Sequence, residues 1–337
     1  MIELSELRDA VQKAFPPDPL TPDRDQSWQL AAEMGWLILE LSDEQGGLGM
    51  GRDASATLHY ELGKSLPAVP LIPALLGLQA VAASTCLAGK EEWIKRVSGG
   101  EYTPLNMLPG AAVEQNADGT LSGVIPGYFE ADMARQVVAA SAAGFLLIPT
   151  DAGGITLSEH PLWDPSRRIF SLELNNYQPD PALVIANPQD AGELHDLISP
   201  SAQLAIASDS LGAANTLLEM TIEYLKTRRQ FDRPLAMFQA LKHRVADHKT
   251  ALEAAEALLW SRAGPTSSME ELGALKALCV RTFRDIAEDA IQLHGGIGLT
   301  EEHPCHRFFK RAMLNCTLAG DVDHWEGVAG RALLSSS

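Results

Sequence analysis

The chain of 337 residues is short of positive charge. Lysine and arginine together number 26 against 44 aspartates and glutamates, which gives a formal net charge of −18 at pH 7. A surface without a broad cationic face is unsuited to the phosphates of a nucleic acid or the headgroups of an anionic membrane. We therefore expect neither partner and interpret the acidity as an ordinary, well-solvated surface.

Cysteine is scarce as well, and the four that occur are scattered. Cys86, Cys279, Cys305 and Cys316 form no C-x-x-C pair. The segment HPCH around Cys305 lacks the second cluster that would complete a zinc site, so no metal is expected. Dispersed thiols of this kind are typical of a reducing cytoplasm.

Long apolar runs are also missing. No stretch approaches the roughly 18 uninterrupted apolar residues of a membrane span. The start MIELSELRDAVQ carries acids where a signal peptide needs a basic start followed by an apolar run. We expect a cytoplasmic protein, and the 46% of hydrophobic residues provide material for two or three compact units.

The residues that are present divide the chain into regions of different texture. Up to about residue 101 the pattern is helical, with a helix capped by Ser27, a second over residues 57–66, and a third after PAVPLIPALL. The following region contains the short β-like runs VVAAS, FLLIPT, GITLSEH and RRIFSLELN, separated by turn residues. These runs predict a small antiparallel barrel or sandwich, since no helical pattern alternates with them.

Long helices are expected again in the C-terminal part. Four leucines recur at intervals of seven: Leu204, Leu211, Leu218 and Leu225. This repeat predicts the buried seam of a helix bundle. A second helix is expected over residues 239–262, and a third begins at the capping box Ser268 to Glu271 and runs to Leu293. The chain is thus expected to be mainly α with a central β domain.

Three glycines crowd into the segment QLHGGIG that ends this third helix: Gly295, Gly296 and Gly298. A Rossmann fingerprint requires a strand, then the glycines, then a helix, so that interpretation is excluded. One remaining interpretation is a helix C-cap with Gly295 in the left-handed region and nothing bound. The other is a backbone that comes close to a ligand.

A cationic loop favours the second interpretation. Arg228, Arg229 and Arg233 lie beside Phe231, and Gln239 opens the next helix. In an acidic chain, such a loop is a local anion site with a planar group to pack against. Arginines that balance a helix dipole would account for Arg228 and Arg229. They leave Arg233 and Gln239 unexplained.

Several segments together resemble the acyl-CoA dehydrogenase family. The matches are R-x-Q-F-x-x-P-x-x-x-F-Q followed by KHRVAD, Q-x-H-G-G-x-G with x-x-E-x-P, GWLILELSDEQGGLGMG, YELGKSLPAVP and WDPSRR. The resemblance spans nearly the whole chain. It implies an N-terminal helical domain over residues 1–101, a middle β-barrel or sandwich over 102–185, and a C-terminal four-helix bundle over 186–337.

The resemblance also implies FAD bound across a subunit interface. The residues implied to contact one part of the cofactor are Arg228, Gln230, Phe231 and Gln239. Those implied to lie against its other end are Gln292, Gly295 and Gly296. The glycines would thus approach a flavin nucleotide, and that nucleotide could be held mostly by a different chain.

The family's reaction is α,β-dehydrogenation of an acyl-CoA thioester, with electrons usually passed to an electron-transfer flavoprotein. A carboxylate takes the α-proton, and the flavin accepts hydride from the β-carbon. The two places where the family has this glutamate correspond to Ala202 and Ala319, and neither alanine accepts a proton. Two nearby acids are left as candidates.

Asp209 lies seven residues beyond Ala202 and so returns to nearly the same helix face. Asp321 lies two residues beyond Ala319, in a loop that could adjust. Each has a structural alternative: Asp209 could be a hydrogen-bonded residue of the bundle, and Asp321 a turn former beside Gly320.

A second departure concerns the flavin ring. The family's T-E-P segment has Met107 and Leu108 in place of its threonine and glutamate, so this chain is poorly equipped to hold the isoalloxazine alone. A short subunit of a heteromeric dehydrogenase, completed by a homologous partner as in the bacterial branch that degrades steroid side chains, fits best. The alternatives are a self-sufficient homo-oligomer (a dimer of dimers) using Asp209 or Asp321, and a non-catalytic scaffold. The sequence reveals neither the acyl group nor the electron acceptor.

Overall fold

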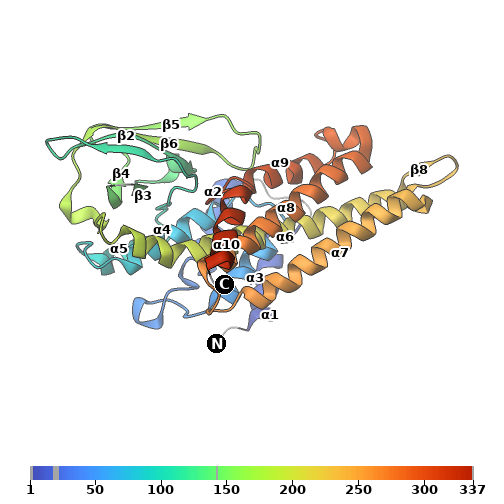
Figure 1. The fold of residues 1–337 in the computed structure, drawn as a ribbon, viewed down its shortest axis with the longest axis horizontal. Coiled ribbons are helices and arrows are strands. Elements are labelled where there is room, and N and C mark those ends of the chain that lie inside the picture. The colour runs from blue at the N-terminus through green and yellow to red at the C-terminus, as the bar shows by residue number, and fades with distance from the viewer. Residues whose placement is uncertain (1–2, 18–22, 142, 336–337) are drawn as a thin grey trace.

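The computed structural model describes residues 3–17, 23–141 and 143–335, which run from helices through strands to helices again (Figure 1). The N-terminal helices are α1 (Leu4–Ala14), α2 (Arg24–Glu33), α3 (Arg52–Gly63), α4 (Leu71–Ala83) and α5 (Lys90–Ser98). Helix α4, LIPALLGLQAVAA, is apolar almost all round and nearly completely buried. It packs against α5, α6 and β3, as expected for a helix without a solvent face.

The expected start of α2 was wrong. Asp23, not Ser27, caps this helix, and its carboxylate accepts the N–H of Gln26 at 2.8 Å. Ser27 lies within the first turn, where its hydroxyl donates to the carbonyl of Asp23. The helix expected over residues 57–66 begins earlier, at Arg52, and ends at Gly63. Both residue types cap helices well, so the sequence alone did not separate them.

Two antiparallel sheets form the middle of the chain. One has the order β1–β2–β6–β5, built from β1 (Ala112–Gln115), β2 (Leu121–Phe129), β5 (Ile155–His160) and β6 (Ile169–Tyr177). The other has the order β3–β4–β7, built from β3 (Gln136–Ser141), β4 (Gly144–Pro149) and β7 (Val184–Ala186). The predicted antiparallel β domain is confirmed, and the four expected runs are strands β3, β4, β5 and β6.

The C-terminal helices are α6 (Ala191–Thr227), α7 (Gln239–Arg262), α8 (Met269–His294), α9 (Cys305–Asn315) and α10 (Val322–Ser335). The four leucines of the predicted seam on α6 are each at most 3% exposed, which confirms it. The capping box that opens α8 is also confirmed, because Ser268 Oγ accepts the N–H of Glu271 and the Glu271 carboxylate accepts the N–H of Ser268.

Helix α6 joins the N-terminal helices to the bundle through a very close crossing with α3. A Cβ atom on Gly212 would lie 1.9 Å from the carbonyl oxygen of Tyr60, and one on Gly63 would lie 2.1 Å from that of Asp209. Only glycine lets the two backbones come this near. Within the described residues, no helix is long and apolar enough to cross a membrane.

Candidate functional site

A cavity of about 630 Å³ lies between the loop that precedes β1, the first turns of α6 and the segment that leads into α10. Its wall is mostly apolar and includes Leu105, Met107, Leu108, Phe145, Ile198 and Val328. Ala202 and Ala319, the two positions where the resemblance puts a catalytic glutamate, both line it. Two segments more than a hundred residues apart in sequence thus meet at one site of a size that suits a bulky organic ligand.

The loop that carries Ala319 is held on several sides. Its N–H donates to the carbonyl of Met107 at 2.7 Å. Its carbonyl accepts from Gln203 Nε2 at 3.1 Å and from Trp325 Nε1 at 2.9 Å. Ala319 has φ +50°, a conformation that non-glycine residues adopt only when their surroundings impose it. The cavity wall is therefore preorganised at this point.

Lys276 fixes the same loop from below. This lysine of α8 is fully buried, and its ammonium donates to the carbonyls of Leu318, at 2.9 Å, and Gly320. Burial lowers the pKa of Lys276 to about 8, because the charged form is poorly solvated inside the bundle. The two carbonyls replace part of the lost hydration, and they tie the loop to α8.

Gln203 is the polar side chain placed next to Ala202. It is 1% exposed and lines the large cavity. Its amide nitrogen is taken up by Ala319, whereas Gln203 Oε1 has no hydrogen-bond partner within the described residues. A buried acceptor without a partner is costly, so this oxygen is suited to receive a donor from a bound ligand.

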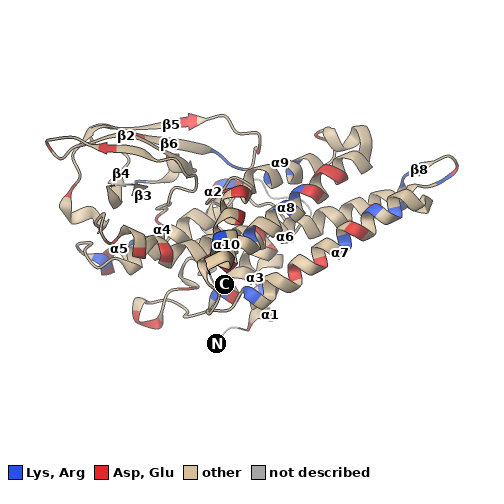
Figure 2. Cartoon of the chain, in the orientation of Figure 1, with Lys and Arg blue, Asp and Glu red and all other residues tan. Residues whose placement is uncertain are grey.

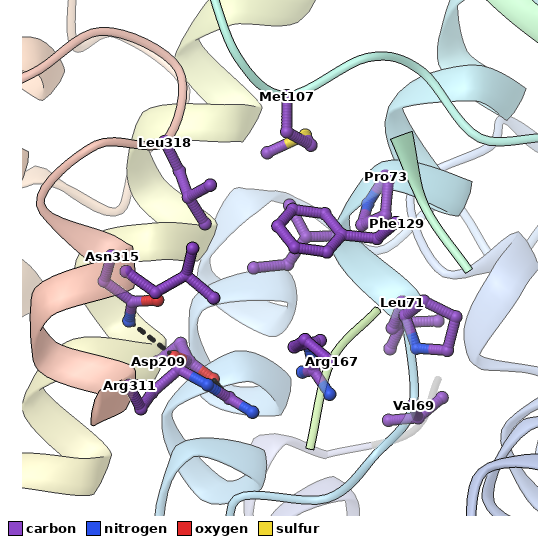
Figure 3. A pocket seen from close by; sticks show the side chains of 13 residues that line it. Val69, Leu71, Pro73, Met107, Phe129, Arg167, Asp209, Arg311, Asn315 and Leu318 are labelled. Atoms are coloured by element: carbon purple, nitrogen blue, oxygen red, sulfur yellow. Dashed lines mark hydrogen bonds and ion pairs between the residues drawn. The ribbon is translucent and has the colours of Figure 1, made fainter. Parts of the chain in front are cut away.

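The two candidate acids lie in different surroundings. Asp321 is exposed, lines the large cavity, and accepts the N–H of His324 at 2.8 Å through Oδ1, where it caps α10. Asp209 does not line that cavity. It lies one α-helical stretch further along α6, beside a separate cavity of about 30 Å³ lined also by Arg167 and Arg311 (Figure 3).

Asp209 belongs to a buried network of charges. Asn315 Nδ2 donates to its Oδ2 at 2.8 Å, and the Arg311 guanidinium lies 3.7 Å from its Oδ1 (Figure 3). Arg311 also forms an ion pair of 2.8 Å with Asp164, and both side chains are 2% exposed. Burial alone would raise the pKa of Asp164, but the charge of Arg311 lowers it on balance. Asp209 is therefore surrounded as a counter-ion is.

The residues expected to contact FAD lie at the far end of the bundle. The chain leaves α6 in a two-residue hairpin between β8 (Arg229–Gln230) and β9 (Arg233–Pro234), which projects from the molecule and carries basic side chains (Figures 1 and 2). Phe231 sits at its tip with φ +51° and is 84% exposed. The Arg233 guanidinium stacks 4.0 Å above the ring of Phe238. Gln239 then opens α7 and is exposed.

The glycine corner lies at the same end. Gln292, Gly295 and Gly296 are exposed, and neither glycine has an atom within 4 Å of where a Cβ would stand. Gly295 has φ +65° and ψ −143°, so it is not the simple left-handed helix cap. Tyr224, in the last turn of α6, donates its hydroxyl to the carbonyl of His294 at 3.2 Å and stacks on that ring at 4.5 Å. The hairpin and the glycine corner are therefore anchored to each other.

This end is far from the large cavity of the same chain. Arg228 follows Ala202 by 26 residues, which corresponds to about 39 Å along α6 at 1.5 Å per residue. One dinucleotide does not span both places within one subunit. Exposed apolar side chains also gather around the hairpin and the glycine corner: Phe231, Met237, Ile297 and Leu299. Such a surface is typical of a contact between chains.

Comparisons with known proteins agree with this arrangement. The family profile "Acyl-CoA dehydrogenase, N-terminal domain" matches residues 4–101, and "Acyl-CoA dehydrogenase, C-terminal domain" matches residues 201–333. The chain belongs to the acyl-CoA dehydrogenase family. It is 31% identical to acyl-CoA dehydrogenase IpdE2 of Mycobacterium tuberculosis (strain ATCC 25618 / H37Rv) over 295 residues, which cover 85% of this chain and 79% of that protein.

Solved structures share the whole acyl-CoA dehydrogenase fold. One is a Tcur3481-Tcur3483 steroid ACAD variant, with a TM-score of 0.83 and 23% identity over 99% of this chain and 98% of that one. Another is the ChsE4-ChsE5 complex from Mycobacterium tuberculosis, with a TM-score of 0.83 and 21% identity over 99% and 96% of the two chains. At these identities the similarity establishes the fold, including the order of helical, β and helical parts.

Sequence reasoning did not identify Gln203 and Lys276 as parts of this acyl-CoA dehydrogenase site. One signal was present for the lysine: in GALKALCV it interrupts an otherwise apolar face of α8. A charged residue in such a place is buried only if it is paired. The carbonyls that pair with it lie 42 and 44 residues further along the chain, so the sequence did not indicate the contact.

Proposed function

We propose that this chain is one subunit of a heteromeric, FAD-dependent acyl-CoA dehydrogenase that forms a double bond between Cα and Cβ of an acyl-CoA thioester. The observation that carries the proposal is the separation within one subunit. The large cavity holds both family base positions, and the segments suited to a nucleotide lie about 39 Å away along α6. A complete site therefore combines the end of one subunit with the cavity of another.

The residues present fit the nucleotide part of FAD. The exposed guanidiniums of Arg228 and Arg233 suit a pyrophosphate, and Phe231 offers a ring face. At Gly295 and Gly296 the open backbone admits a close approach. When bound, FAD supplies the acceptor for the hydride from Cβ. This chain's part is to bind the cofactor, shape the cavity and exclude water from it.

The α-proton is removed by a carboxylate that reaches the large cavity. Asp321 meets this condition, because it lines the cavity, whereas Asp209 is held by Asn315 and Arg311 elsewhere. If this chain supplies the base, we propose Asp321. If it does not, the partner subunit supplies a glutamate, and the alanines at 202 and 319 leave room for the substrate.

The substrate class and the partners follow by analogy only. Relatives of this chain include a protein described as a steroid ACAD and the ChsE4-ChsE5 complex, which contains two different subunits. We propose a steroid-derived acyl-CoA as substrate, a homologous subunit as partner and an electron-transfer flavoprotein as acceptor. The four free thiols are consistent with a cytoplasmic enzyme.

The proposal is tested by purifying the chain alone and together with the product of the neighbouring gene. Reduction of an artificial electron acceptor is then measured with an acyl-CoA in both samples. We expect activity from the pair and none from the chain alone. Full activity of the chain alone would establish the self-sufficient homo-oligomer instead. A stable pair without activity toward short-chain, long-chain and steroid acyl-CoA would favour the scaffold.

A further inference from the structure

A second, smaller chamber lies behind the large cavity. It is a cavity of about 10 Å³ lined by the polar side chains of Glu40, Ser55, His59, Gln79 and Ser201, which we name the polar chamber. Four segments contribute to it: the 3-10 region after α2, and helices α3, α4 and α6. The volume suits a single oxygen atom of water size, and several hydrogen-bonding groups surround it.

The polar chamber adjoins the large cavity. Leu76 of α4 lines both, so its side chain forms part of the wall between them. On α6, Ser201 and Ala205 face the chamber, whereas Ile198 and Ala202 face the large cavity. These residues belong to two consecutive turns of one helix. The chamber therefore begins where the mostly apolar wall of the large cavity ends.

Glu40 is the central group of the chamber. The Ser201 hydroxyl donates to its Oε2 at 3.4 Å, and Ser55 and Gln79 also hydrogen-bond to the carboxyl. Burial raises the pKa of Glu40, and the hydrogen bonds together with the charge of Arg52 offset only part of this effect. Such a carboxyl donates a hydrogen bond when protonated and accepts one when ionised.

His59 completes the lining. It is 2% exposed, and burial lowers its pKa to about 4, so its ring is neutral at pH 7. A neutral imidazole has one donor and one acceptor nitrogen. An apolar enzyme pocket for a plain hydrocarbon has no need of a carboxyl, an imidazole, an amide and two hydroxyls at its closed end. Burying these groups costs free energy unless a partner satisfies them.

We propose that the polar chamber binds a hydroxyl or ketone oxygen at the far end of the acyl group, with Glu40 as the residue that selects for it. The inference rests on the proposed function, since the acyl body would fill the large cavity. The ligand class is a bulky acyl-CoA whose remote end carries one hydrogen-bonding oxygen. Leu76 separates the apolar part of this ligand from its polar end.

The test compares two acyl-CoA thioesters that share a saturated bicyclic skeleton. One is a plain hydrocarbon, and the other carries a hydroxyl or a ketone on the ring carbon most distant from the thioester. The dissociation constant by calorimetry and kcat/KM are measured for the chain purified with its partner subunit. We expect the oxygenated thioester to be favoured at least about tenfold, because a site built for a hydrogen bond discriminates strongly against an analogue that lacks it.

Substitution of Glu40 should remove this preference. In Glu40→Leu the ratio of the two kcat/KM values should fall to about one or reverse, because an apolar wall accepts the hydrocarbon equally well. Glu44→Leu, an exposed acid of the same segment, is the matched control and should keep the wild-type ratio. Melting temperatures show whether each variant is folded. Should Glu40→Leu not fold, Ser201→Ala and Gln79→Leu are measured for the same loss of preference.

The outcomes are distinguishable. An equal preference in wild type and Glu40→Leu, or a wild-type preference for the hydrocarbon, overturns the assignment of the polar chamber while leaving the dehydrogenase function intact. If the wild-type complex neither binds nor oxidises either thioester or any other acyl-CoA, the proposed function itself fails, and the polar chamber loses its ligand with it.

Discussion

His59 is a buried imidazole that must stay neutral in the folded chain. Its pKa is lowered to about 4 by burial, against about 6.5 in an unfolded chain. The unfolded state therefore binds more protons between these values, so the stability of the fold is lost as the pH falls from 6.5 through 4. We expect His59→Gln to reduce the loss of unfolding free energy between pH 7 and pH 4 by about 2–3 kcal/mol. Urea unfolding at both pH values measures it, and an unchanged difference would contradict the assignment.

Asp209 and Asp321 should respond differently to the same substitution. Asp209→Asn leaves Arg311 with one fewer counter-charge inside the bundle, so we expect a loss of about 1–3 kcal/mol in stability. The folded variant should retain its turnover. Asp321→Asn changes an exposed group and should hardly affect stability. If this chain supplies the base, Asp321→Asn abolishes turnover of the complex. Loss of turnover in folded Asp209→Asn would reverse the two roles.

The difference between these acids shows how far counting along a sequence reaches. Counting placed Ala202 and Ala319 correctly enough that both line one cavity. The same counting put Asp209 on the face of Ala202, but seven residues correspond to about 10 Å along a helix. There α6 contacts α3 and α9, and the cavity has ended. Helical periodicity gives a direction around the axis, and only the packing partners decide what a residue meets.

The crossing of α3 and α6 provides a sharp test of the packing between the N-terminal helices and the bundle. Gly212→Ala puts a methyl group against the carbonyl of Tyr60, which forces the helices apart. We expect a cost of about 1–3 kcal/mol in unfolding free energy. Gly192→Ala is the matched control, since it lies in the first turn of the same helix and a Cβ there meets nothing within 4 Å. It should be neutral or raise stability by up to about 1 kcal/mol. Equal effects would contradict the close crossing.

Elements with a clear periodic signal were predictable, and those with local interruptions were not. Helices α6, α7 and α8 follow an uninterrupted apolar repeat and were expected within one or two residues where bounds were given. Strand β2, LSGVIPGYF, was not expected, because Gly123, Pro126 and Gly127 break its alternation. The structure accommodates them with register shifts against β6 between Leu121 and Gly123 and between Pro126 and Tyr128.

Across the whole molecule, the apolar cores cross the boundaries of its parts. One core joins α1, α2 and α3 to strands β2 and β6, and another joins α4 and α5 to β3, β4 and the start of α6. The domain limits at residues 101 and 185 stay a prediction for this reason. The large cavity lies where such regions meet, and its lining runs from Leu76 to Val328. A site assembled from segments so far apart is not readable from any local pattern.

The charges follow the same long-range logic. Arg24 of α2 contacts Glu130 and Asp132 of the β domain, and Arg311 of α9 contacts Asp164. These pairs link the three parts of the subunit in its interior and along one side. The hairpin beyond α6 is different, because its arginines are exposed at the end of an acidic molecule (Figure 2). Charges so placed are available to a ligand or to another chain.

The most direct measurement is FAD retention by the complex when Arg228 is replaced. In Arg228→Ala we expect FAD binding to weaken by about 1.5–3 kcal/mol, the range of a charge-assisted hydrogen bond. The dissociation constant is obtained from flavin fluorescence during titration of the deflavinated complex. Arg135→Ala, an exposed arginine of the β domain, is the control and should bind FAD as the wild type does. Wild-type FAD affinity in Arg228→Ala would show that the hairpin and the glycine corner do not hold the cofactor.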